Sequence, residues 1–193
     1  MQPLVRVTSA LVLLMGFALT GCGSAGSTTP TSNAPVKPIQ FKSTVIVGGA
    51  LPARYTCDGK NISPPLEWGR VPSSTKELAL LVIGFVPSST PNSYNLSIEW
   101  AVAGLPPKLH HLAAGQLPSG AFLGGTNSGK TQYSICPEKG TRRQYEFALY
   151  AIPASVKIPR GFAGIQILSR IGASTAPTPA SAAGIIEAGY KRR

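Results

Sequence analysis

The segment from Glu77 to Ile83 constrains the fold of this chain more than any other stretch, because six apolar residues follow Glu77 without interruption. A strand with one exposed face alternates apolar and polar residues, whereas a strand covered on both faces has a continuous apolar run. Residues 77–83 are therefore predicted to form a central strand with packed material on both faces.

Other segments predict neighbours for this strand. Residues 41–47, 97–103 and 144–151 are rich in β-branched and aromatic residues, and loops rich in Pro, Gly and Ser separate them. Helical periodicity is weak and late, at residues 160–171 and 179–188. The pattern predicts a mostly β fold with a few short helices, including a C-terminal helix.

The first 22 residues are typical of a bacterial lipoprotein leader. A short apolar run, residues 11–18, follows Arg6 and ends in Leu19-Thr20-Gly21-Cys22. A transmembrane anchor is the alternative, but the run is too short to span a bilayer. We expect a signal peptide over residues 1–21 and a lipidated Cys22. Acyl chains such as palmitate would then hold the protein on the extracytoplasmic side of the bacterial cell membrane.

Composition divides the rest of the chain. Residues 22–38 are small, polar and Pro-rich, which predicts a disordered tether, and the folded domain is expected over residues 39–193.

The net charge is +11, and the basic residues are scattered apart from residues 142–143 and 191–193. Secretion argues against a nucleic-acid partner, so anionic lipid headgroups or acidic envelope polymers are closer candidates. General solubility is the simpler explanation of the same charge.

Two cysteines remain for the folded domain once Cys22 is assigned to lipid. Cys57 and Cys136 would lie in an oxidising compartment, where an even pair favours a disulfide. Two free buried thiols are the main alternative. A metal pair is a weaker one, because structural zinc sites usually need four ligands. No metal and no cofactor are expected.

Several blocks of the sequence resemble bacterial phosphatidylethanolamine-binding proteins, which are also called Raf kinase inhibitor-like proteins. The longest block runs from Gly49 to Trp68. The other matching blocks follow in the same order: residues 77–82, 100–106, 125–128, Tyr133, 136–137, 145–151 and 189–192. The resemblance implies a β-sandwich-like core with a small anion pocket at one end between loops. Within the first block, Asp58-Gly59 is favoured as a turn over a role for Asp58 as a catalytic acid.

The pocket positions depart from the family pattern. Family pockets carry an Asp-Pro-Asp-Ala-Pro loop after the central strand, a histidine before the tryptophan of the next strand, and a His-Arg-Tyr before the last core strand. In this chain the loop after the central strand, residues 83–87, contains no aspartate. Glu99 takes the place of the first histidine, and Arg143-Gln144-Tyr145 takes the place of His-Arg-Tyr. The resemblance therefore implies a pocket of altered chemistry, with these candidate ligand-binding residues: Glu99, Pro137, Arg143, Tyr145 and Tyr190.

Two arrangements of this altered pocket are open. Glu99 and Arg143 could face each other as a self-satisfied pair that fills the cavity and excludes anions. Alternatively, Arg142 and Arg143 could replace the histidines as phosphate donors through their planar forks. Glu99 would then repel a dianion unless an amine approaches too, so a zwitterionic headgroup would suit this mixed site.

Three classes of function are compatible with these residues. The first is a binding module for a small anionic or zwitterionic ligand. The second is an interaction or inhibitor module with a closed pocket, which acts on an envelope protein through mobile loops at residues 84–97 and 115–132. An enzyme is the least favoured class, because no Ser-His-Asp, Cys-His or metal cluster can be assembled. His110 and His111 are expected in a surface loop.

Overall fold

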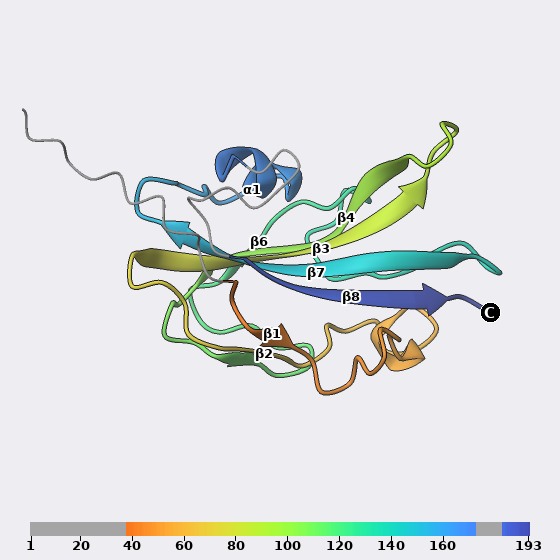
Figure 1. The fold of residues 1–193 in the computed structure, drawn as a ribbon, viewed down its shortest axis with the longest axis horizontal. Coiled ribbons are helices and arrows are strands. Elements are labelled where there is room, and N and C mark those ends of the chain that lie inside the picture. Colours follow the sequence, from red (N-terminus) through yellow and green to blue (C-terminus); the bar gives the residue numbers. More distant parts are fainter. Residues whose placement is uncertain (1–37, 173–182) are drawn as a thin grey trace, which may run out of the picture. The chain divides into compact units, whose positions relative to one another are not determined.

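The computed structural model describes residues 38–172 and 183–193. Two antiparallel sheets form, one with the strand order β1-β2-β5 and one with the order β6-β4-β3-β7-β8 (Figure 1). The elements are β1 (Phe41–Lys42), the 3₁₀ helix η1 (Ala53–Tyr55), β2 (Leu66–Trp68), β3 (Thr75–Pro87), β4 (Tyr94–Leu105), β5 (His111–Leu112), β6 (Phe122–Leu123), β7 (Arg142–Pro153), α1 (Ile165–Arg170) and β8 (Ala183–Lys191). The prediction of a mostly β fold is confirmed.

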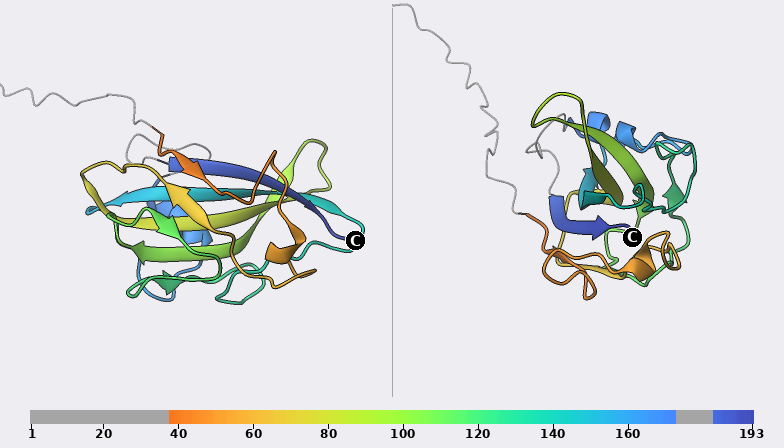
Figure 2. Two further views of the ribbon diagram at one scale, coloured as in Figure 1. Left: turned by 90° about the horizontal axis from the view of Figure 1, so that it is seen from below. Right: turned by 90° about the vertical axis from the view of Figure 1, so that its right-hand side faces the viewer.

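Strand β3 is the central strand that its apolar run predicts. Its even-numbered residues from Leu78 to Val82 belong to the core shared with the three-stranded sheet. Its odd-numbered residues from Ala79 to Ile83 belong to a second core that includes Ile167 of α1. Figures 1 and 2 show the five-stranded sheet as the middle layer, with β1 and β2 on one face and α1 on the other. Both faces of β3 are therefore closed to water, and burial of each large side chain contributes about 1.5–3 kcal/mol.

The prediction of a C-terminal helix over residues 179–188 is wrong for residues 183–188, the part that the structure describes. Residues 179–182 lie outside the described residues, and from Ala183 the chain forms β8. β8 pairs antiparallel with β7, from Arg142 opposite Lys191 to Tyr150 opposite Ala183. The β-branched Ile185 and Ile186 suit a strand, and the distant partner β7 overrides the weak helical periodicity. The earlier helix is shorter than predicted, with α1 covering only Ile165–Arg170.

The region predicted as a mobile loop over residues 84–97 is mostly strand. β3 continues to Pro87 and β4 begins at Tyr94, so only residues 88–93 connect them. The predicted strand over residues 41–47 is limited to β1, because only Phe41 and Lys42 pair with β2. Residues 115–132 are mainly irregular but contain the short strand β6.

The leader, Cys22 and nearly all of the predicted tether lie outside the described residues. Every side chain of the two cores lies between Ile39 and Tyr190. Within residues 38–172 and 183–193, no helix has the length and apolar character needed to cross a bilayer.

Candidate functional site

A β-bulge in β4 sets the position of Glu99. Val82 of β3 pairs with Trp100, but the next residue, Ile83, pairs with Ile98. Glu99 is thus the extra residue between two paired positions. Bulges redirect a side chain relative to the regular alternation of a strand, and they are frequent next to binding sites.

Glu99 and Arg143 come together across the central strand. Oε1 of Glu99 lies 4.0 Å from Nη1 of Arg143, and the two side chains are only 15% and 17% exposed. Burial raises the pKa of Glu99 above its ordinary value, although hydrogen bonding from Ser97 and the positive charge of Arg143 act in the opposite direction. The carboxylate therefore lies in a covered site where an added positive group would be favourable.

Tyr145 lies beside this pair, on the same side of β7 as Arg143. Its side chain is buried, and its hydroxyl has no hydrogen-bond partner among the described residues. Burial, followed by the nearby Glu99 charge, raises the pKa of Tyr145 well above its ordinary value, so the hydroxyl keeps its proton. Nearly all buried hydroxyls in proteins are hydrogen-bonded, so an unpartnered one beside two opposite charges is unusual.

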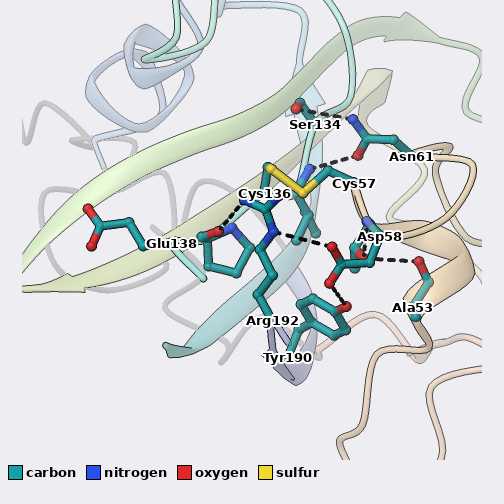
Figure 3. The surroundings of a disulfide bond; sticks show 12 residues. Ala53, Cys57, Asp58, Asn61, Ser134, Cys136, Glu138, Tyr190 and Arg192 are labelled. Atoms are coloured by element: carbon teal, nitrogen blue, oxygen red, sulfur yellow. Dashed lines mark hydrogen bonds and ion pairs between the residues drawn. A yellow bond between two sulfur atoms is a disulfide. The ribbon is translucent and has the colours of Figure 1, made fainter. Parts of the chain in front are cut away.

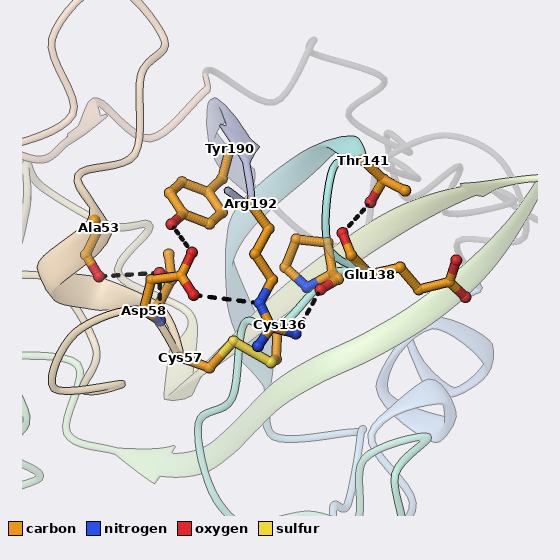
Figure 4. Close-up of polar contacts among 10 residues, drawn as sticks. Ala53, Cys57, Asp58, Cys136, Glu138, Thr141, Tyr190 and Arg192 are labelled. Atoms are coloured by element: carbon orange, nitrogen blue, oxygen red, sulfur yellow. Dashed lines mark hydrogen bonds and ion pairs between the residues drawn. A yellow bond between two sulfur atoms is a disulfide. The ribbon is translucent and has the colours of Figure 1, made fainter.

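Tyr190 belongs to a second polar cluster next to the first. Its hydroxyl donates a hydrogen bond to Oδ2 of Asp58, and Nε of Arg192 lies 3.2 Å from Oδ1 of the same carboxylate (Figure 3). Nη1 of Arg192 also donates to the carbonyl oxygen of Pro137, at 3.2 Å (Figure 4). Tyr190 pairs directly with Arg143 between β8 and β7, which makes the two clusters neighbours.

Asp58 has a larger role in this region than the sequence pattern predicts. It lies in a turn, as its Asp-Gly step predicts, but its carboxylate also joins Tyr190 and Arg192. The hydrogen bond from Tyr190, with a smaller contribution from Arg192, holds the pKa of Asp58 below its ordinary value. Asp58 and Tyr190 both lie in matching family blocks, but nothing local in the sequence identifies them as partners.

The predicted disulfide is confirmed. Cys57 and Cys136 are bonded, with their Cα atoms 5.2 Å apart (Figure 3). The bond joins the segment that carries Asp58 to the segment that carries Pro137. It therefore fixes two backbone segments that Arg192 also contacts.

Trp100, which follows Glu99, is a core residue, and the two histidines lie apart from both clusters. Trp100 is buried in the core and makes an edge contact with Tyr133, with ring centroids 5.5 Å apart. His110 and His111 are exposed and line an open groove of about 920 Å³ on the three-stranded sheet, together with Trp68. Neither Glu99 nor Arg143 lines that groove, and no group of three or more metal-ligating side chains occurs in the described part of the chain.

Comparison with known proteins assigns the chain to a family. The family model of the phosphatidylethanolamine-binding proteins matches residues 41–185. This chain belongs to that family. That these two clusters correspond to the family pocket, with Glu99 and Arg143 in place of histidines, stays a prediction from the resemblance.

Three relatives show how far the similarity extends. A Mycobacterium tuberculosis protein that carries the name lipoprotein LppC is 32% identical over 184 residues, covering 88% of each chain. The crystal structure of the family homologue CT736 from Chlamydia trachomatis has 28% identity and a TM-score of 0.66, covering 81% of this chain and 99% of that one. The E. coli family member YbcL has 26% identity and a TM-score of 0.64, covering 81% and 100%.

Proposed function

We propose that this family member binds a small zwitterionic ligand, with the phosphate held by Arg143 and the ammonium group held by Glu99. The observation that carries the proposal is the buried Tyr145 hydroxyl, which has no partner among the described residues beside two opposite charges. A ligand phosphate oxygen could accept a hydrogen bond from this hydroxyl and from the arginine fork.

The two charges favour a zwitterion over a simple phosphate. A dianion near Arg143 would also approach Glu99, and the repulsion would be strong in a site so poorly exposed to water. An ammonium group next to Glu99 removes that repulsion. The name of the family refers to phosphatidylethanolamine, whose headgroup carries both a phosphate and an ammonium group.

The Glu99–Arg143 distance supports an open pair better than a closed one. At 4.0 Å the two groups are at the outer limit of an ion pair. Each side chain therefore keeps more of its hydrogen-bonding capacity for a ligand than it would in a close bidentate contact. The function proposed is binding without catalysis.

We also propose that Cys22 carries the lipid and that the domain works on the extracytoplasmic side of the cell membrane. The leader sequence supports this, as does the name of the mycobacterial relative. Incorporation of a palmitate analogue into the wild type, and its absence from a Cys22→Ser variant, is the expected result. Equal labelling of both would contradict the assignment.

Native mass spectrometry of the full chain tests the ligand. Phosphoethanolamine, inorganic phosphate and ethanolamine are added separately to wild type, Arg143→Ala and Tyr145→Phe. A saturable phosphoethanolamine adduct that both substitutions weaken is the expected result. If no adduct forms, the pair closes the pocket, and an envelope protein becomes the preferred partner.

A further inference from the structure

The β3–β4 hairpin extends beyond the rest of its sheet. The pairing of β3 with β7 ends at Phe85 opposite Gln144, whereas its pairing with β4 continues to Pro87 opposite Tyr94. Figure 1 shows the two strands leaving the plane of β7 and β8 as a separate ribbon. The last part of this hairpin is therefore covered by no other strand of the described residues.

One face of the projecting hairpin is apolar and largely exposed, although Phe85 is half-buried against the second core. Phe85 pairs with Leu96 and Pro87 pairs with Tyr94, so these four side chains share a face. Tyr94 is 58% exposed and Leu96 is 44% exposed. The rings of Phe85 and Tyr94 meet edge to face, with centroids 6.3 Å apart, which holds both rings on that face. No charged residue occurs from Gly84 to Ile98.

Basic residues gather at the same end of the sheet. Arg142 and Lys191 are exposed and paired at the ends of β7 and β8, and residues 192–193 add two more arginines. Both ribbon views place the C-terminal end of the chain at the end toward which the hairpin points (Figures 1 and 2). The nearby carboxylates Asp58 and Glu99 already face arginines, and Glu138 is exposed in the adjoining turn. Further along the same face of β7 and β8, Glu146 and Glu187 lie opposite each other, four residues from the basic strand ends.

We infer that the hairpin face formed by Phe85, Pro87, Tyr94 and Leu96 enters the interface of an anionic lipid bilayer, while the basic strand ends contact the headgroups. An uncharged apolar tip bordered by arginine and lysine is complementary to a negatively charged membrane surface. Tyrosine prefers the headgroup level of a bilayer, because its ring is apolar and its hydroxyl is polar. The inference is independent of the ligand proposed for the pocket.

Tryptophan fluorescence tests this contact on the full chain reconstituted into vesicles. Tyr94→Trp places a probe on the hairpin, and Ser74→Trp places a matched probe in the turn at the opposite end of β3. The native Trp68 and Trp100 are buried, so their signal is subtracted with the wild type. Vesicles contain brominated phosphatidylcholine, with or without phosphatidylglycerol.

In phosphatidylglycerol vesicles, bromine is expected to quench the hairpin probe of Tyr94→Trp by about half and to leave the turn probe of Ser74→Trp nearly unchanged. Arg142→Gln with Lys191→Gln should reduce the quenching, whereas Arg143→Ala, which tests the pocket, should not abolish it. Equal quenching of the two probes would overturn the inference. A blue shift of the hairpin probe without bromine quenching would also overturn it, and would assign the face to a protein contact.

Discussion

Glu99 and Arg143 reach each other across β3 at a point where that strand carries Gly84. The two residues belong to β4 and β7, which flank β3 on opposite sides. A Cβ atom at Gly84 would lie 2.8 Å from Oε1 of Glu99 and 3.2 Å from a ring carbon of Tyr145. The missing side chain of Gly84 therefore leaves the space in which the carboxylate lies.

Gly84→Ala is expected to displace the Glu99 carboxylate and to abolish phosphoethanolamine binding. The cost in unfolding free energy should be small, about 1 kcal/mol, because the end of the glutamate side chain can move. Urea unfolding and ligand titration of the same sample measure both effects. Ligand binding at wild-type affinity would contradict this explanation of Gly84.

The pH dependence of stability should report the burial of Glu99. A carboxyl whose folded-state pKa is raised contributes stability that is fully present below its ordinary pKa and is lost as the pH rises through the raised value. The wild type should therefore lose stability relative to Glu99→Gln between about pH 4 and pH 7. Urea midpoints at both pH values give the difference, with Glu138→Gln as the exposed control. A difference that does not change with pH would contradict the role of burial.

Asp58 should show the opposite dependence. Its folded-state pKa is lowered, chiefly by the hydrogen bond from Tyr190, so its contribution is present above the ordinary aspartate value and is lost as the pH falls through the lowered one. The stability advantage of the wild type over Asp58→Asn should shrink on acidification from about pH 7 to pH 3. Tyr190→Phe should weaken this dependence. An unchanged advantage at low pH would show that the charge of Asp58 contributes nothing.

The disulfide should make a large contribution to stability. Cys57 and Cys136 are 79 residues apart in sequence, and closing a loop of this length stabilises by about 4 kcal/mol in the chain-entropy account. The double variant Cys57→Ala, Cys136→Ala should lose about that much unfolding free energy in urea. Reduced wild type is the control and should match the variant. Equal stability of the variant and the oxidised wild type would contradict the prediction.

The fold can be predicted where the signal is local. Six consecutive apolar residues in β3 indicate a strand covered on both faces, and both cores confirm it. β8 cannot be recognised locally, because its strand conformation depends on pairing with β7, about 40 residues earlier in the chain. The β3–β4 hairpin cannot be recognised from the sequence either, because Pro87 and the polar stretch from Ser88 to Ser93 are typical of a longer loop.

The candidate site is predictable only in part, for similar reasons. The family blocks point to Tyr145 and Tyr190, and the substitutions at Glu99 and Arg143 stand out against them. The hydrogen bonds of Asp58 join it to residues 132 and 134 positions away, and no local pattern encodes such contacts. The bulge that positions Glu99 depends on the register of β4 against β3, which is likewise a tertiary property.

Ligand preference tests the central claim most directly, because the claim assigns one ligand charge to each residue. Isothermal titration compares phosphoethanolamine with inorganic phosphate on wild type and on Glu99→Gln. The wild type should prefer phosphoethanolamine by about tenfold or more, and the substitution should remove that preference by relieving phosphate repulsion and deleting the ammonium partner. An unchanged preference in Glu99→Gln, or equal binding of both compounds to the wild type, would contradict the account.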